Sequence, residues 1–524
     1  MLLTNIYTGM FLAIIAVGFL FRNNTEKTNR IVDISFCVTI AFIAATFFSL
    51  FPLTKTYTYA DSSVFIYIGK MMKNGLVPYR DLFDHKGIWL YLIQYLGLVL
   101  GERGAIGIWI LEVIHMIFTT WFMYKVAEMF SRDRIVKYIA VIAIVVMCGM
   151  KVYEGGNLTE EYALPWIAFA LYIFLKYFKD EKYEIKEIVW LGIGFAVVAL
   201  LRVNMIAVWI AVMPIIFVKM LFKHQYKDVL QCVLAFCGGA IIVLVPVLIY
   251  LVKTDSLKQF IECYIIFNVS YSEGGSSLQS IAKVWLQCIE NLLLAFGAGV
   301  VSIFVFRKNK LFWLNCWILL VSLYFSHMSG KFYAHYGMIL LPMLIPLAEG
   351  GIEMLYKILS INGKLKFKLK FPKNAIMLVG LCAVILGAAV VQYKWANLIR
   401  EPMLQAGGVK ALQEYLVENT KEKDDVLIVG NDAKYYLLAD RKTENKYFYQ
   451  TPPIKISEEL YNDFLKELEE KTSDTIVVMG TKEKCLEKQD NLGEVCRYLE
   501  NMALGGEFSC QTFKHFYIYT KVEK

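Results

Sequence analysis

Long apolar runs recur along most of the chain, and they constrain its fold more than any other feature of the sequence. Only 19% of the 524 residues are charged, against roughly 25% in soluble domains. A single soluble core stops growing at about 250–300 residues, so it cannot bury this many apolar segments. We therefore predict a polytopic α-helical membrane protein with about twelve spans. The twelve runs lie at 5–21, 31–53, 104–124, 135–150, 161–178, 187–201, 204–222, 228–252, 285–306, 311–328, 337–357 and 374–393.

The apolar run at 88–100 is short for a membrane crossing, and charged Asp81, Asp84 and Lys86 precede it. We therefore expect an interfacial or re-entrant helix at this run. A second interfacial helix is expected to open at Asp61, because apolar side chains follow it at helical spacing. Both helices belong to a predicted external loop at 54–103.

Lys and Arg side chains collect in the loops at one predicted membrane face, for example at 125–137, 176–186 and 357–373. Basic loops mark the cytoplasmic side of a membrane protein. Both termini and the loop 54–103 are then expected outside the cytoplasm, in a protein of the cell membrane. The net charge of +8 is explained by these loops, so no nucleic-acid partner is expected.

Beyond residue 393 the composition becomes that of an ordinary soluble domain. Apolar strand patterns alternate there with helical patterns, which is typical of a small α/β fold. The strand patterns lie at 425–430, 474–480 and 515–520, and the helical patterns at 458–470 and 483–502. We predict a transmembrane catalytic domain at 1–393 and an extracytoplasmic α/β domain at 394–524.

Ionisable side chains gather at the predicted external span ends, where partial desolvation is costly and a functional explanation is needed. Asp61 is our candidate general base, because a hydroxyl nucleophile near neutral pH needs a carboxylate to take its proton. Capping of its own helix is the alternative role for Asp61. The candidate supporting carboxylates are Asp84, Glu160 and Glu161. The candidates for holding an anionic phosphate are Arg80, His85, Lys86, Arg202, Lys331, His335 and Tyr336.

Several of these side chains have more than one interpretation. Glu160 and Glu161 could support Asp61, cap the helix that begins near Thr159, or bind a divalent cation. A cation site would use Asp84, His85 and Glu160, whose oxygen-rich ligands favour Mg²⁺ or Mn²⁺ over Zn²⁺. Arg202 interrupts an apolar stretch, so it either faces a polar cavity or extends to the lipid headgroups.

The order of the motifs resembles the GT-C superfamily of polytopic glycosyltransferases. Asp61 is followed by PYRDLFDHKG (78–87), GGNLTEEY (155–162), Arg202-x-Asn204 and SGKFYAHY (329–336). The similarity is to bacterial relatives of protein O-mannosyltransferases and of the lipid A aminoarabinose transferase. It implies transfer of a sugar from a polyprenyl-phosphate donor to a cell-envelope acceptor, usually with inversion, with Asp61 at the position of the family's catalytic carboxylate. The O-mannosyltransferases have an Asp-Glu pair where this chain has Asp61-Ser62, which argues against a protein acceptor.

A transporter or flippase for a lipid-linked or anionic solute is the main alternative, because charges at membrane boundaries also mark transport paths. A sensor with an external ligand-binding domain is a second alternative. The sequence has no internal symmetry of the kind common in transporters, and the charged motifs gather at one predicted face. Surface chemistry on a lipid-linked donor, with membrane lipids around the spans, fits this distribution best.

Overall fold

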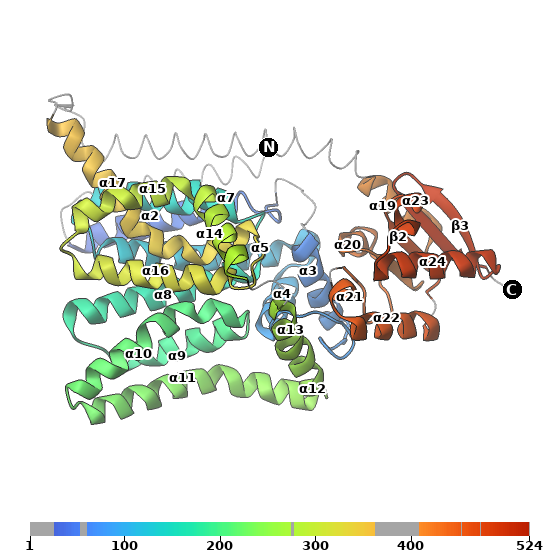
Figure 1. Ribbon diagram of the computed structural model, residues 1–524, viewed down its shortest axis with the longest axis horizontal. Helices are drawn as coiled ribbons and strands as arrows, with labels where there is room; N and C mark the ends of the chain where they lie inside the picture. The colour runs from blue at the N-terminus through green and yellow to red at the C-terminus, as the bar shows by residue number, and fades with distance from the viewer. Residues whose placement is uncertain are drawn as a thin grey trace.

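A bundle of helices forms most of the molecule, and a smaller α/β unit lies at one end of it (Figure 1). The computed structural model describes residues 26–52, 60–273, 277–361, 408–451, 453–471 and 473–522. The predicted spans at 5–21 and 374–393, and the predicted domain boundary after residue 393, lie outside these described residues.

The helical bundle follows the predicted spans closely within the described residues. Its long helices are α2 (Glu26–Ala45), α5 (Ile106–Ala127), α6 (Arg134–Ile142) continued by η2 (Ala143–Cys148) and α7 (Gly149–Val152), α8 (Thr159–Asp180), α9 (Ile185–Ala199), α10 (Ala207–Phe222), α11 (Tyr226–Lys253), α16 (Lys310–His327) and α17 (Leu341–Ile361). The shorter elements are η1 (Arg103–Ala105), η3 (Val203–Ile206), α12 (Leu257–Phe260), η4 (Ile261–Ile266), α13 (Phe267–Glu273) and η5 (Ala334–Leu340).

Large apolar side chains cover the outside of this bundle. In α11, Leu234 is 63% exposed and Ile242 is 59% exposed, which only a lipid environment accommodates. Four helical segments of the described chain are long and apolar enough to cross a membrane, and a bent helix pair would make a fifth. The count of twelve spans stays a prediction.

The run at 285–306, expected as one span, is broken in the structure. It forms α14 (Leu278–Asn291) and α15 (Leu293–Phe306), which meet at an angle of 91°. Polar Gln279, Lys283 and Glu290 recur along α14, whereas α15 is entirely apolar apart from one serine. A half-polar helix is more stable at the membrane boundary than in hydrocarbon, which explains the bend.

The two short helices of the predicted external loop are present as α3 (Ala60–Lys73) and α4 (Ile88–Leu100). The placement of α3 on the membrane surface stays a prediction, but its expected polar, solvent-facing side is absent, because every residue from 62 to 69 is buried. One side of α3 packs on α4 and another on α20 (Lys434–Ala439) of the α/β unit. The helix is therefore enclosed between the two parts of the molecule.

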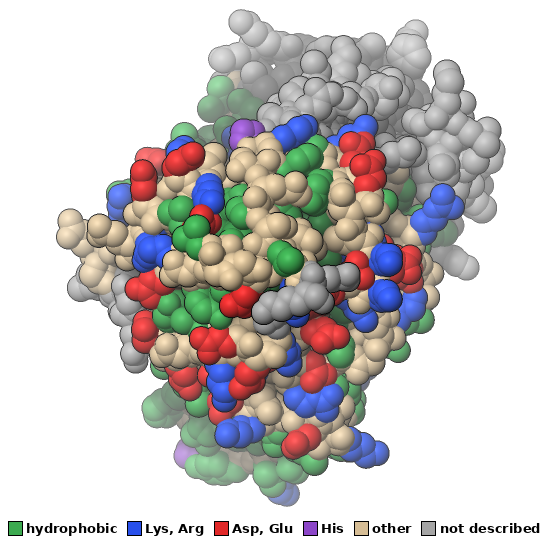
Figure 2. All heavy atoms as spheres, turned by 90° about the vertical axis from the view of Figure 1, so that its right-hand side faces the viewer, with side chains coloured by type: hydrophobic (Ala, Val, Ile, Leu, Met, Phe, Trp, Pro, Cys, Tyr) green, Lys and Arg blue, Asp and Glu red, His purple; other side chains and the backbone are tan. Residues whose placement is uncertain are grey.

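The α/β unit, residues 409–521, holds a four-stranded sheet in the order β1-β2-β4-β3. β1 (Val426–Val429) and β2 (Thr475–Met479) are parallel and pair Val426 with Thr475, while β4 (Phe516–Lys521) and β3 (Phe508–Phe513) continue the sheet antiparallel. Its helices are α19 (Val409–Asn419), α20, α21 (Pro453–Ile456), α22 (Glu458–Glu470), α23 (Lys482–Leu486) and α24 (Asn491–Leu504). Figure 2 shows acidic and basic side chains intermixed on the outer face of this unit, as on a surface in contact with water.

Two details of this unit differ from the sequence-based expectation. The helix expected at 483–502 is divided into α23 and α24, because Asp490 caps a new helix by accepting a hydrogen bond from the Gly493 amide at 3.0 Å. Strand β3 was not expected, and its half-exposed edge position explains its weak apolar pattern.

Small residues allow a close helix crossing in the bundle, between α9 and α11. A Cβ atom at Gly192 would lie 2.0 Å from the carbonyl oxygen of Phe236, and one at Gly239 would lie 2.1 Å from that of Val189. The two helices therefore touch backbone to backbone, as membrane helices do where small residues meet.

Replacing Gly239 tests this crossing. We expect Gly239→Ala to force α9 and α11 apart and to lower the free energy of unfolding by about 1–3 kcal/mol, seen as a lower melting temperature of the detergent-solubilised protein. At the neighbouring Gly238 an added methyl group would meet no atom within 4 Å beyond the adjacent residues and backbone of its own helix, so Gly238→Ala is the matched control and should melt like the wild type. Equal melting temperatures for the two variants would contradict this packing.

Candidate active site

The first turn of α3 carries Asp61 and is held from two sides. Asp61 itself is exposed, while the next two residues, Ser62 and Ser63, are buried. The Ser62 hydroxyl accepts a hydrogen bond from the Asn157 side chain at 2.8 Å, and the Ser63 hydroxyl donates to Asp432 of the α/β unit at 2.9 Å. Asp61 therefore stays accessible on a turn whose backbone cannot shift easily.

Asn157 holds this turn from within the helical bundle. Gly155, Gly156 and Asn157 all have positive φ angles, of 92°, 76° and 54°, which explains the Gly-Gly-Asn sequence ahead of α8. The Asn157 side-chain oxygen accepts hydrogen bonds from Gln94 at 2.7 Å and from the Tyr162 hydroxyl at 2.6 Å. These contacts bind α3, α4 and α8 into one polar network.

Glu161 extends the polar network of Asn157 toward α5. One of its carboxylate oxygens accepts a hydrogen bond from the Asn157 amide at 2.7 Å, and the carboxyl group lies beside Glu112 in the middle of α5. Glu161 thus reaches Asp61 only through Asn157 and Ser62. Glu112 was not anticipated, although a lone glutamate within an apolar span is costly and could have been singled out.

Asp84 is a buried carboxylate between the helical bundle and the α/β unit. One oxygen accepts hydrogen bonds from the His85 amide and from the Tyr449 hydroxyl, both at 2.7 Å, and the other accepts from the Tyr91 hydroxyl at 2.7 Å. Burial raises the pKa of Asp84, and the nearby Lys86 and the two tyrosines oppose that rise. Three donors therefore support the charged form of a carboxylate that is itself buried.

Gly87 brings this loop into contact with the turn that carries Arg202. The Gly87 amide donates to the carbonyl of Leu201 at 3.2 Å, and a Cβ atom at Gly87 would lie 1.9 Å from the carbonyl oxygen of Leu200. Only glycine permits this approach. The close contact brings the backbones next to Lys86 and Arg202 together, and both charges act on His85.

Cationic side chains gather around His85. Its ring nitrogen Nε2 lies 3.0 Å from the Lys86 ammonium, and the charges of Lys86, Arg202 and Lys331 together with burial hold the pKa of His85 well below 6.5. A neutral imidazole accepts a hydrogen bond from the lysine. Burial also lowers the pKa of Lys331. We call Lys86, Arg202 and Lys331, together with the neutral His85 that they surround, the cationic cluster.

Arg202 is anchored by an ion pair from one guanidinium nitrogen and by stacking on one face. Its guanidinium lies 2.7 Å from a carboxylate oxygen of the buried Glu160 and stacks over the Tyr336 ring at 4.1 Å from the centroid. His335, next to Tyr336, pairs with Glu154. The structure therefore brings Glu160, His335 and Tyr336 to the edge of the cationic cluster, with Glu160 as the partner of Arg202.

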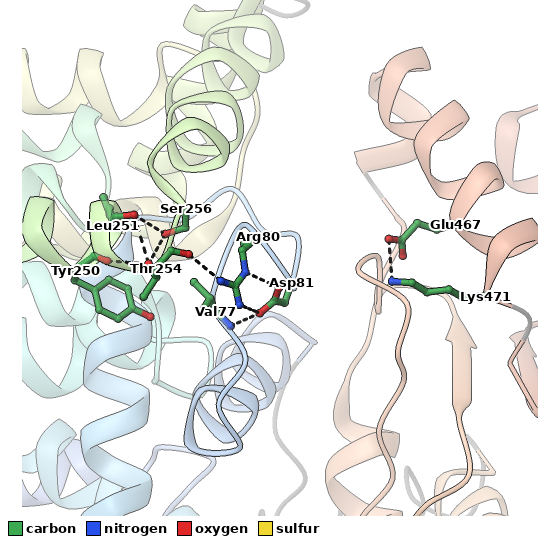
Figure 3. Close-up of polar contacts among 9 residues, drawn as sticks. All are labelled: Val77, Arg80, Asp81, Tyr250, Leu251, Thr254, Ser256, Glu467 and Lys471. Atoms are coloured by element: carbon green, nitrogen blue, oxygen red, sulfur yellow. Dashed lines mark hydrogen bonds and ion pairs between the residues drawn. The ribbon is translucent and has the colours of Figure 1, made fainter.

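Arg80 points elsewhere. Figure 3 shows its guanidinium engaged with the neighbouring Asp81 and with the carbonyl of Thr254 at the end of α11. These contacts, at 2.8–2.9 Å, use donors on all three guanidinium nitrogens. The structure therefore gives no support to the expected phosphate-binding role of Arg80. The Arg80 side chain instead joins the loop before α4 to the end of α11.

The expected cation ligands do not form a metal site in the described part of the chain. No group of three or more His, Cys, Asp or Glu side chains there is placed to hold a metal ion. The Asp84 oxygens are occupied by three hydrogen-bond donors, and Glu160 is paired with Arg202 and with the Thr159 hydroxyl. A requirement for Mg²⁺ or Mn²⁺ stays a prediction.

The α/β unit contributes two side chains that the sequence did not single out, Asp432 and Tyr449. They meet Ser63 and Asp84 across more than 360 positions of sequence. No periodicity or motif signals such a pairing, because it arises from the docking of two separately patterned segments.

The buried His85 makes stability depend on pH. In the unfolded chain His85 binds a proton as the pH falls below about 6.5, whereas in the folded protein it stays neutral to lower pH. The unfolded state then binds more protons, so wild-type stability falls with pH by up to about 1.4 kcal/mol per unit from this group. Between pH 7.5 and 5.5 we expect the melting temperature of the wild type to fall more steeply than that of His85→Gln, and parallel curves would contradict the assignment.

The fold has clear counterparts among solved structures. The crystal structure of ArnT from Cupriavidus metallidurans bound to undecaprenyl phosphate superposes with a TM-score of 0.59 at 11% identity, covering 95% of this chain and 99% of that one. The apo structure of the same protein superposes with a TM-score of 0.59 at 10% identity, covering 98% of each chain. The expected likeness to the GT-C superfamily is thereby confirmed at the level of the fold.

Sequence comparison identifies the family of the chain. No curated protein sequence matches it. A family described as "Putative competence-induced protein Ccs4 N-terminal domain" matches over residues 22–371, which is about two thirds of the chain and includes the whole helical side of the site. The protein therefore belongs to this Ccs4 N-terminal domain family and has the fold of the GT-C transferase ArnT.

Proposed function

We propose that this protein is a membrane glycosyltransferase that moves a sugar from a polyprenyl-phosphate donor to an acceptor hydroxyl or amine. The observation that carries the proposal is an accessible carboxylate, Asp61, on a fixed turn at the end of a lipid-facing helical bundle. The Tyr449 hydroxyl links it to the cationic cluster, because the charges of Asp61 and Asp84 both act on Tyr449 and Asp84 lies beside Lys86. A nucleophile needs the carboxylate, and a departing phosphate needs the cations.

In the proposed reaction Asp61 takes a proton, and Lys86 and Arg202 stabilise the departing phosphate. The acceptor oxygen or nitrogen attacks the anomeric carbon while the bond from that carbon to the phosphate oxygen breaks, and Asp61 takes the proton of the nucleophile. The phosphate keeps the bonding electron pair and leaves as an anion beside Lys86 and Arg202. Attack opposite the leaving group inverts the anomeric carbon, and no general acid is required because a phosphate is a stable leaving group.

The lipid part of the donor is proposed from the environment and from the fold. The ArnT structure that shares this fold was solved with undecaprenyl phosphate, and the helices here expose apolar side chains such as Leu234 and Ile242 to lipid. A long polyprenyl chain would lie in that apolar environment with its phosphate at the cationic cluster. Such a donor delivers its sugar at the membrane boundary, where Asp61 lies in the proposed arrangement.

The proposed location is the outer face of the cell membrane. The distribution of Lys and Arg in the predicted loops supports an external site. The intermixed charges on the α/β unit (Figure 2) suit an aqueous compartment, and we propose that residues 394–524 form an extracytoplasmic domain. The acceptor is then a cell-envelope molecule, and the Asp61-Ser62 sequence disfavours a protein acceptor.

Replacing Asp61 and Lys86 separates the two halves of the mechanism. In proteoliposomes supplied with a panel of polyprenyl-phosphate sugars and a cell-envelope acceptor extract, we expect Asp61→Asn to slow transfer by about 100-fold or more while donor binding is retained. Lys86→Gln should instead weaken binding of undecaprenyl phosphate by about tenfold or more. The control is Lys258→Gln, which removes the same charge from a side chain that is 82% exposed and should leave both quantities unchanged.

Two results would overturn the proposal. Transfer at the wild-type rate by Asp61→Asn would remove the carboxylate from the mechanism. A wild-type protein that moves lipid-linked sugar between leaflets without cleaving it would favour the transporter alternative.

A further inference from the structure

The α/β unit docks on the loop that carries the candidate site through a continuous set of polar contacts. Besides the bond from Ser63 to Asp432, the Thr443 amide donates to the Tyr67 hydroxyl at 3.2 Å and the Phe83 amide donates to the carbonyl of Lys446 at 3.0 Å. These contacts run from the carboxyl end of β1 to residue 449. They fix one segment of the α/β unit against both α3 and the loop before α4.

Tyr449 is the contact of this set that reaches the charged side chains of the site. Its buried hydroxyl donates to Asp84 at 2.7 Å, and the charges of both Asp84 and Asp61 act on it. Asp84 therefore has one tyrosine donor from each part of the molecule, Tyr91 from α4 and Tyr449 from the α/β unit. The two tyrosines bind different carboxylate oxygens and so fix the rotation of the group.

Asp84 in turn shapes the backbone that presents Lys86. It accepts the His85 amide at 2.7 Å, while Tyr79 donates to the Lys86 carbonyl at 2.7 Å and Asn268 donates to the His85 carbonyl at 2.7 Å. A buried carboxylate that loses a donor must move or take up a proton. Movement of Asp84 would shift the backbone that carries Lys86, and protonation of Asp84 would remove the negative charge beside the Lys86 ammonium.

We propose that Tyr449 is a positioning residue of the transfer site: from the α/β unit it holds Asp84, and thereby the His85–Lys86 backbone from which the Lys86 side chain meets the donor phosphate. The α/β unit then completes the phosphate side of the site in addition to whatever acceptor it contacts. This inference rests on the proposed transferase function, because it assigns the cationic cluster to a polyprenyl phosphate.

The test measures binding of undecaprenyl phosphate to the full-length protein in detergent, so it does not depend on finding the acceptor. We expect Tyr449→Phe, which removes only the hydroxyl, to weaken binding about tenfold, as for loss of one hydrogen bond to a charged group. Tyr447→Phe is the matched control. Tyr447 is two positions before Tyr449 in the sequence, and its hydroxyl contacts Asp463 within the α/β unit at 3.3 Å. The control should bind like the wild type, and all variants are compared at matched folded fraction from their melting curves.

A double-variant cycle distinguishes positioning from simple packing. If Tyr449 acts through Asp84, then Tyr449→Phe added to Asp84→Asn weakens binding no further than Asp84→Asn alone. Additive losses, or unchanged binding in Tyr449→Phe, would overturn the positioning role while leaving the transferase proposal intact. If the wild type does not bind undecaprenyl phosphate, the assignment of the cationic cluster fails, and both proposals fail with it.

Discussion

The hydrogen bonds on Ser62 and Ser63 are the constraint on which the rest of the site depends. Ser62 ties the first turn of α3 to Asn157 in the helical bundle, and Ser63 ties it to Asp432 in the α/β unit. Because both serines are buried and hydrogen-bonded, the backbone of this first turn is held in place. The adjacent Asp61 stays open to solvent. A carboxylate on a backbone held in this way needs only its own side chain to be ordered when it meets a nucleophile.

The cationic cluster is tolerated because its charges are compensated within the fold. Arg202 has Glu160 and the Tyr336 ring, Lys86 lies against the neutral His85 ring, and Asp84 supplies a negative charge nearby. Isolated charges at a membrane boundary would be expelled toward water. Compensation keeps the cations in place, where in the proposed function they would meet the donor phosphate.

Much of the helical fold could be predicted from the sequence, because apolar length alone specifies a membrane helix. The bend at Leu292 and the burial of α3 were missed, since both depend on packing against distant segments. In the site, the grouping of Lys86 with Arg202 followed from their shared place at the predicted external span ends, although the close approach at Gly87 is visible only in three dimensions. Tyr449 carries no local signal at all, because its partner lies 365 positions away.

A cryo-electron microscopy structure of the full-length protein in lipid nanodiscs with undecaprenyl phosphate tests the central claim most directly. The account predicts phosphate density within hydrogen-bonding distance of the Lys86 ammonium and on the Arg202 side of the site, with the space for a sugar facing Asp61. Phosphate density at the opposite end of the helical bundle, or a lipid bound without contact to the cationic cluster, would contradict it.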